Sequence, residues 1–173
     1  MAEGTKTDQM FRVVIAAPIE RVWHELTKTD AAQGAIFNAW LHLRGGLVPG
    51  AAMQMKTGSG RHTLVVGEVV ECDPPRRFVH THRFTQYDDP VCTVSYELEP
   101  VAGGVEVTLR VTGVAAGSRS AKDMAAGGPM IVSGLKAICE TGRPSLGTRL
   151  MYLMFEWMEF VLPARTKSEH WPL

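Results

Sequence analysis

The segment from residue 51 to residue 114 constrains the fold more than any other part of the sequence. Apolar and polar residues alternate there with a period of two, which is typical of β-strands that bury one face. Clusters of Gly, Pro and Asp interrupt the alternation and provide the backbone angles that tight turns require. The pattern predicts five strands, at residues 51–57, 62–72, 77–85, 92–100 and 105–114. Because the turns are short, neighbouring strands are expected to run antiparallel.

One further strand and two short helices are predicted before this segment. Residues 10–16 form an apolar and β-branched run, which is typical of a strand. Between Pro18 and Thr27 the apolar residues recur at three- and four-residue spacing, which predicts an amphipathic helix. A second short helix is expected from Ala31 to Leu41. With the N-terminal strand, the sheet has six predicted strands.

The chain becomes helical again in its last third. Ser118 or Ser120 is expected to cap a helix that is interrupted at 127–128, where two glycines adjoin. A restart is predicted at Pro129, since proline suits a first helical position. Gly142 is the expected end of this helix because glycine adopts the left-handed conformation of many C-caps.

The final helix is predicted from Leu146 to Leu162 and is unusually apolar. From Leu150 onward only Glu156 and Glu159 interrupt its apolar surface. It is shorter than the roughly 20 residues that span a bilayer, and an integral membrane protein is not expected. Such a helix needs burial on most sides, as a lid over this molecule, in a homodimer or on a membrane surface. Acidic polar positions disfavour a membrane surface, so a lid or a homodimer through Leu150 to Leu162 is expected.

Composition narrows the possible partners. The chain has 173 residues, and 18 Lys and Arg balance 18 Asp and Glu. No basic surface is available for a phosphate backbone, so nucleic-acid binding is disfavoured. Hydrophobic residues make up 45% of the chain, enough for a sizeable core. The three cysteines are widely spaced and the first residues are polar, so reduced thiols and a cytoplasmic location are expected.

Four segments resemble motifs of one protein superfamily. Ala17-Pro-Ile-Glu-Arg-Val-Trp23 is similar to its N-terminal motif, and Gly67-Glu-Val-Val-Glu-Cys-Asp-Pro-Pro-Arg-Arg-Phe78 to its two-proline hairpin. Gly104-Val-Glu-Val-Thr-Leu109 and Leu135-Lys-Ala-Ile-Cys-Glu-Thr-Gly142 are similar to a later strand and to the terminal helix. In this order they resemble the SRPBCC (START-like) superfamily, in the branch named after the activator of heat-shock-protein ATPase. The resemblance is to a bacterial-like, single-domain member.

The resemblance implies an α+β helix-grip fold. Here that means a curved six-stranded antiparallel sheet around a long C-terminal helix, with two short helices after the first strand and an extra C-terminal helix. The expected domain covers residues 9–142, and residues 143–173 form an extension that carries the apolar helix 146–162. In this superfamily an apolar cavity between sheet and helix holds lipids, polyketides or other small hydrophobic molecules.

His80-Thr-His82 is the most informative candidate feature. If a four-residue loop closes the hairpin at residues 73–76, Val69 faces His80 and Gly67 faces His82. Both histidines then lie on the concave face of the sheet. They could be hydrogen-bonded wall residues, orient a ligand or move a proton. A metal would need a third ligand, which the sequence does not offer, so no metal or other cofactor is expected.

The other candidate ligand-binding residues are apolar or aromatic side chains that alternation or the resemblance places on the inner face. Plain core packing is an equally good interpretation for most of them. The complete candidate set is Phe37, Trp40, Met53, Met55, Phe78, His80, His82, Phe84, Tyr96, Ile131 and Leu135.

Three functions remain open at this stage. The first is binding of a small hydrophobic ligand, lipid-like or aromatic, with His80, His82 and Tyr96 as polar anchors. The second is a cyclase or dehydratase in which His80 or His82 transfers a proton. The third, suggested by the branch name, is a chaperone ATPase co-factor. Phosphate-binding, dinucleotide-binding and serine-hydrolase motifs are absent from the sequence, so no catalytic residue is assigned.

Overall fold

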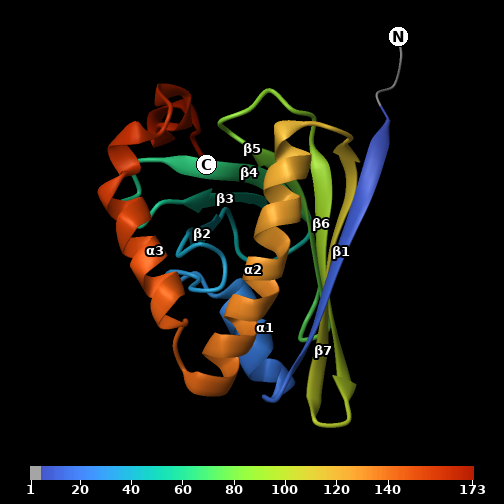
Figure 1. Ribbon diagram of the computed structural model, residues 1–173. Helices are drawn as coiled ribbons and strands as arrows, with labels where there is room; N and C mark the ends of the chain where they lie inside the picture. The colour runs from blue at the N-terminus through green and yellow to red at the C-terminus, as the bar shows by residue number, and fades with distance from the viewer. Residues whose placement is uncertain (1–4) are drawn as a thin grey trace.

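The computed structural model describes residues 5–173 and contains one antiparallel sheet (Figure 1). Its strand order is β1-β7-β6-β5-β4-β3-β2. The strands are β1 (Lys6–Ile15), β2 (Trp40–Leu43), β3 (Ala52–Lys56), β4 (Thr63–Asp73), β5 (Arg77–Phe84), β6 (Cys92–Val101) and β7 (Gly104–Ala115). The helices are α1 (Ile19–Thr27), α2 (Arg119–Thr141) and α3 (Leu146–Trp157), followed by the 3-10 turns η1 (Glu159–Val161), η2 (Ala164–Thr166) and η3 (Ser168–His170).

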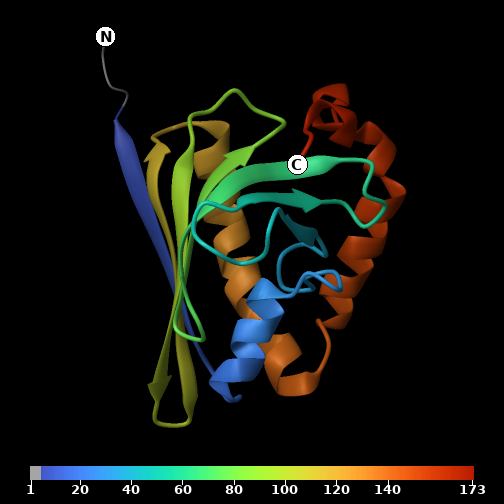
Figure 2. The ribbon, with the colours of Figure 1, turned by 180° about the vertical axis from the view of Figure 1, so that it is seen from behind.

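The sheet curves around α2, which packs against β1 and β7, and α1 packs against the lower part of α2 (Figures 1 and 2). The core lies between the concave face and these helices, where Ile15, Val107 and Leu135 are completely buried. Alternation along each strand places one apolar set on this face. The prediction of an α+β helix-grip fold is confirmed.

The sheet has seven strands rather than the six predicted. The prediction of a second short helix from Ala31 to Leu41 is also wrong. Phe37 and Asn38 have φ angles of 51° and 57°, which a right-handed helix cannot contain. The segment instead forms turns closed by a hydrogen bond from Gln33 N to Ala39 O, and it then enters the edge strand β2. Apolar residues at helical spacing therefore line a compact loop rather than a helix.

The predicted interruption of α2 at the paired glycines is also wrong. The helix runs without a break from Arg119 to Thr141 and contains Pro129 in its interior. A Cβ atom on Gly128 would lie 2.2 Å from the Phe11 ring of β1, so this glycine allows the helix to approach the sheet. Tertiary packing outweighs the low helix propensity of these residues. The predicted ends are confirmed: Ser118 caps the helix by accepting from Ala121 N, and Gly142 adopts φ 83°.

The β4–β5 hairpin reaches the predicted pairing by a different register. Cys72 pairs with Phe78, one residue away from the partner that a four-residue loop requires. A register shift between Val69 and Glu71 then restores the pairing of Val69 with His80. The bulge therefore compensates for the shorter turn, and the histidines keep their predicted place on the concave face.

The final helix is shorter and far more exposed than predicted. It ends at Trp157 rather than Leu162, and the chain continues as the turns η1 to η3. Tyr152 is the one residue of α3 that is buried; most of its large apolar side chains face solvent. Within one copy only one side of α3 faces the body, so the expected burial on most sides stays a prediction that a second copy would have to satisfy. Among the described residues, no helix is long and apolar enough to cross a membrane.

Candidate functional site

A cavity of about 1290 Å³ lies inside the grip. Its floor is the concave face of the sheet, to which all seven strands contribute, and α2 forms one wall. The loop before β2 forms a second wall. The inner side of α3, with η1 and the residues that follow, closes a third. Segments that are distant in the sequence therefore enclose one space, as in most ligand pockets.

The centre of the floor is a row of aromatic and imidazole rings on β5. Alternation places Phe78, His80, His82 and Phe84 on the same face. The His80 ring centroid lies 5.1 Å from that of Phe78 and 5.8 Å from that of His82, and Phe84 meets His82 edge-on at 4.8 Å. Tyr96, from β6, pairs with Phe78 and stacks on it at 6.4 Å. Two polar imidazoles therefore lie within an otherwise apolar floor.

The tautomer of His80 follows from its one hydrogen bond. Nδ1 lies 2.9 Å from the carbonyl oxygen of Thr81, which can only accept, so Nδ1 carries the proton. Burial lowers the pKa of His80 to about 4, against a smaller opposing effect of this bond. The ring is therefore neutral at pH 7. Its Nε2 atom keeps a lone pair, and no group among the described residues donates to it.

His82 is the unusual residue of the floor. Both of its ring nitrogens are buried, and neither finds a hydrogen-bond partner among the described residues. Burial, with a smaller effect of neighbouring His80, lowers the pKa of His82 to about 3. A neutral imidazole has one donor and one acceptor, and leaving both unsatisfied costs free energy.

Gly67 of β4 brings the neighbouring strand close to these histidines. A Cβ atom on Gly67 would lie 2.0 Å from the carbonyl oxygen of Thr81, the same oxygen that accepts from His80. The Thr81 hydroxyl in turn accepts from Glu68 N at 2.8 Å. Only glycine permits this approach, so the position of the imidazoles depends on a residue that has no side chain.

The hydroxyl group of Tyr96 is a further polar group of the floor. No hydrogen bond from it is found among the described residues, and burial alone raises the pKa of Tyr96. The phenol is therefore neutral and can donate. His80 stacks beside Tyr96, with their ring centroids 6.5 Å apart, so the two side chains present polar atoms to the same region.

The structure brings together nearly all of the candidate residues from the sequence. Around the cavity lie Phe37, Trp40, Met53, Met55, Phe78, His80, His82, Phe84, Tyr96 and Ile131. Leu135 does not line it: this side chain is completely buried in the core under α2. Leu135 lies one turn beyond Ile131 on α2.

Sequence reasoning did not find several lining residues. Phe11 of β1 could have been found, because it alternates with the buried Ile15. Tyr152 and Phe155 of α3 carried no such signal, since their role depends on where the helix packs. The hydroxyl group of Tyr152 donates to the carbonyl oxygen of Gly34 at 2.7 Å and so fixes α3 beside the loop before β2.

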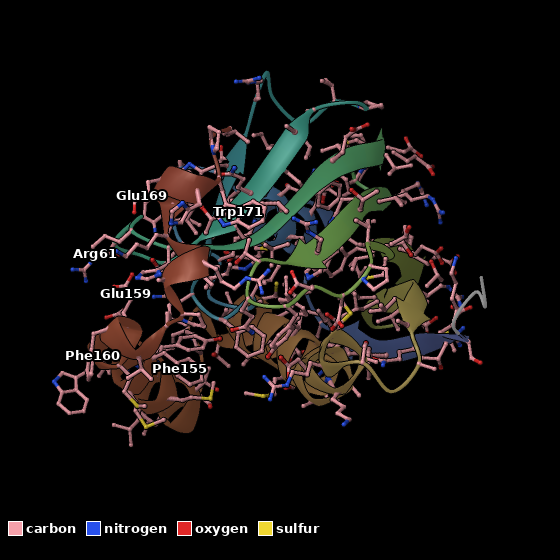
Figure 3. The ribbon with its side chains drawn as sticks, turned by 90° about the horizontal axis from the view of Figure 1, so that it is seen from above. Arg61, Phe155, Glu159, Phe160, Glu169 and Trp171 are labelled. Carbon is pink, nitrogen blue, oxygen red and sulfur yellow. The ribbon has the colours of Figure 1, made fainter. Side chains whose placement is uncertain are left out.

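A buried carboxylate anchors the end of α3. Glu159 accepts hydrogen bonds from Thr57 at 2.6 Å and Ser59 at 2.5 Å, and it pairs with Arg61 at 2.9 Å (Figure 3). Burial alone would raise the pKa of Glu159, but these partners together hold it below its ordinary value. The β3–β4 turn and the C-terminal segment are thereby joined. Figure 3 also shows Phe155 on the inner side of α3 and Phe160 at the outer edge of the molecule.

The charges around the cavity are all negative. No Lys or Arg among residues 5–173 lines it, whereas Asp123, Glu156 and Glu159 do. Asp123 accepts from Tyr87 at 2.6 Å, and Glu156 accepts from Asn38 at 3.1 Å. The described residues contain no cluster of three His, Cys, Asp or Glu that could hold a metal ion.

The comparisons with known proteins identify the family. The sequence matches the family described as "Activator of Hsp90 ATPase homolog 1-like protein" over residues 16–140. The chain belongs to this family. The match supports the SRPBCC-type assignment that the four motifs indicated. It ends before α3, so the C-terminal segment of this member lies outside the matched region. A search among curated proteins found no match.

Several solved structures share the family fold at low sequence identity. DynU16, from the dynemicin biosynthetic locus, has 23% identity to this chain and a TM-score of 0.64. The alignment covers 79% of this chain and 48% of DynU16, so this chain spans about half of that protein. CalU16 from Micromonospora echinospora has 17% identity and a TM-score of 0.57, with coverages of 89% and 80%. The Aha1 dimer from Colwellia psychrerythraea has 17% identity and a TM-score of 0.62, with coverages of 79% and 98%. At these identities the likeness concerns the fold alone.

Proposed function

We propose that this family member binds one small hydrophobic molecule in the cavity of the grip. The observation that carries the proposal is His82, which lines an apolar cavity and whose buried ring nitrogens have no hydrogen-bond partner among the described residues. Folding alone does not favour this arrangement, because an apolar side chain in the same place would avoid the desolvation cost. A ligand that fills the space and bonds to the imidazole offsets that cost. The driving force is burial of apolar surface, roughly 25 cal/mol per Å².

The inner face supplies the shape of the binding site. Met53 and Met55 are flexible and polarisable, so they adapt to irregular ligands. Phe37 of the loop before β2, Trp40 at the start of β2 and Ile131 of α2 also line the cavity. Specificity then depends on this shape together with the few polar groups of the floor.

Native mass spectrometry of the freshly purified protein tests the proposal, with Nile red fluorescence as a second readout. We expect a copurified small molecule, or saturable Nile red binding once it is removed. Val94→Phe projects a larger side chain into the cavity, whereas Thr93→Phe places the same side chain on the opposite face of β6. Val94→Phe should weaken Nile red binding at least tenfold and Thr93→Phe should not. Failure of folded wild-type protein to bind either probe or copurified ligand would overturn the proposal.

We also propose that two copies of the chain associate through the outer face of α3. Four large apolar residues of α3 are separated alternately by four and three residues, the spacing of a coiled-coil seam, and Phe160 of η1 follows three residues later. Their exposed fractions are far above those of core residues. They are Leu146 (79%), Leu150 (70%), Leu153 (63%), Trp157 (77%) and Phe160 (77%).

The charges beside this seam favour an antiparallel pair related by a two-fold axis near Leu153. In that register Leu146 faces Phe160 of the second copy, and Arg149 lies near Glu156 of the second copy. Such an interface is self-complementary, as a two-fold dimer requires. Acidic residues and a single Arg do not suit an anionic membrane surface.

Sedimentation equilibrium tests the association. Wild-type protein should reach a dimer, and Leu153→Glu should shift it to monomer, because two carboxylates would then meet at the axis. Val14→Glu is the matched control, since Val14 is an exposed apolar residue of β1 remote from α3. A wild-type monomer at high protein concentration, or a Leu153→Glu dimer of unchanged strength, would contradict this part of the proposal.

A further inference from the structure

The polar atoms of the floor restrict the chemistry of the ligand beyond its being hydrophobic. His80 Nε2 is an acceptor with a lone pair and no donor, because the Thr81 carbonyl fixes the proton on Nδ1. The floor therefore holds an acceptor at a known atom. The molecule that occupies the cavity must place an O–H or N–H group against that atom, or leave it unsatisfied at a cost in affinity.

His82 strengthens the same restriction. As a neutral imidazole it offers one donor and one acceptor, and both of its nitrogens lack partners among the described residues. A hydroxyl group can donate and accept at once, so it can satisfy either nitrogen. The His80 and His82 ring centroids are 5.8 Å apart, so substituents on one ring system can reach both.

Charge excludes one class of largely apolar ligands, the long-chain carboxylic acids in their ionised form. A carboxylate needs a cation or several donors, and no Lys or Arg among the described residues lines the cavity. Glu156 and Asp123 lie on its walls and would repel an anion. Burial lowers the pKa of both histidines well below 7, so they supply no positive charge either.

We propose that the natural ligand is an electrically neutral, largely apolar molecule that donates a hydrogen bond from a hydroxyl or N–H group to His80 Nε2, with His82 and Tyr96 bonding its other polar substituents. This inference rests on the proposed ligand-binding function and narrows it. Hydroxylated polycyclic molecules and sterol-like alcohols belong to this class. Ionised fatty acids and other carboxylates do not.

Three pyrene probes of nearly equal shape test the inference at pH 7 by direct fluorescence titration. 1-Hydroxypyrene carries a donor, 1-methoxypyrene lacks it, and 1-pyrenecarboxylate is an anion. We expect 1-hydroxypyrene to bind about tenfold more tightly than 1-methoxypyrene, the effect of one buried hydrogen bond. The carboxylate should bind at least tenfold more weakly than 1-methoxypyrene. The additional methyl group favours binding of 1-methoxypyrene, so the measured preference for 1-hydroxypyrene underestimates the contribution of the hydrogen bond.

A variant assigns the effect to the floor. In His80→Phe/His82→Phe the preference for 1-hydroxypyrene over 1-methoxypyrene should fall to about one, while 1-methoxypyrene still binds. His24→Phe, at an exposed position on α1, is the matched control and should keep the tenfold preference. If the double variant does not fold, the three-probe comparison on the wild-type chain still decides the question.

The possible outcomes separate the inference from the function beneath it. Equal binding of 1-hydroxypyrene and 1-methoxypyrene, or tightest binding of the carboxylate, would overturn the inference and leave ligand binding intact. If no probe saturates and native mass spectrometry shows an empty chain, the proposed function itself fails. The expected order of affinities supports both.

Discussion

The floor of the cavity and the outer face of α3 depart from ordinary protein architecture in opposite directions. On the floor, polar imidazoles are buried without partners. On α3, large apolar side chains such as Leu150 and Trp157 face water. Each arrangement costs free energy in the isolated chain, one through desolvation and the other through exposed apolar surface. The contrast teaches that the two regions would be satisfied by different occupants, and our proposals assign a small molecule with a polar group to the inside and an apolar protein surface to the outside.

The same substitution in the two regions should have opposite effects, and this gives the largest predicted difference. Gly67→Ala places a Cβ atom 2.0 Å from the Thr81 carbonyl and should lower the free energy of unfolding by about 3 kcal/mol. Gly147→Ala in α3 meets no atom within 4 Å and should be neutral or stabilise by up to about 0.5 kcal/mol. Urea unfolding measures both. A tolerated Gly67→Ala would mean that the floor is not held by close packing of β4 and β5.

Removal of the carboxylate that anchors α3 should have the next largest effect. Glu159→Ala deletes the bonds from Thr57, Ser59 and Arg61 and should cost about 2 kcal/mol locally. Hydrogen exchange should rise in residues 146–170 and stay unchanged on the floor around His80. Arg61→Ala is the control, because it removes only the exposed partner and should cost less than about 1 kcal/mol. Faster exchange in β5 would show that the two regions are not independent.

Acid should destabilise the floor before it affects α3. The folded pKa values of His80 and His82 are about 4 and about 3, below the ordinary value of 6.5, so the unfolded chain binds protons first as the pH falls. The stability that the two neutral histidines contribute is therefore complete above about pH 7, and it is lost as the pH falls towards 4 for His80 and towards 3 for His82. Each histidine should account for about 1.4 kcal/mol at pH 5.5.

His82→Phe separates this effect from the titration of carboxylates. The variant should lose less stability than the wild type between pH 7.5 and pH 5.5, by about the amount assigned to one histidine. The paired carboxylates Glu140 and Glu159 have lowered pKa values and weaken only at lower pH. Equal pH slopes in wild type and variant, from urea unfolding at each pH, would mean that His82 is solvated in the folded state.

The outer face of α3 should give the smallest effect on the folded chain. Leu150→Gln changes an exposed side chain and should alter monomer stability by less than about 0.5 kcal/mol. Leu98→Ala, at a completely buried position of the core, should cost about 3 kcal/mol and serves as the reference. Thermal unfolding at low protein concentration measures both. A large loss in Leu150→Gln would place the face of α3 among the interactions that stabilise the monomer.

Prediction from the sequence succeeded where local pattern decides the outcome. Alternation in β5 assigned Phe78, His80 and His82 to one face, and the structure keeps them there although the hairpin turn has a different length. Prediction failed in two segments. At residues 31–41 the helical spacing of apolar residues predicted a helix that does not form. At residues 127–129 two glycines and a proline predicted an interruption of a helix that is continuous. In both segments contacts with distant residues, such as Phe11 against Gly128, outweigh local propensity.

The sequence by itself determined the antiparallel sheet, the family and the aromatic and imidazole side chains that β5 contributes to the cavity, because a period of two and short turn motifs are local properties of the chain. Only the tertiary structure decided that His82 has no partner and that α3 exposes its apolar residues. Whether a face is covered depends on segments far away in the chain. Tyr152 bonds to Gly34, 118 residues away in the chain, and Glu159 bonds to Ser59, 100 residues away. No local sequence pattern predicts such a long-range contact, since it results from the packing of the whole molecule.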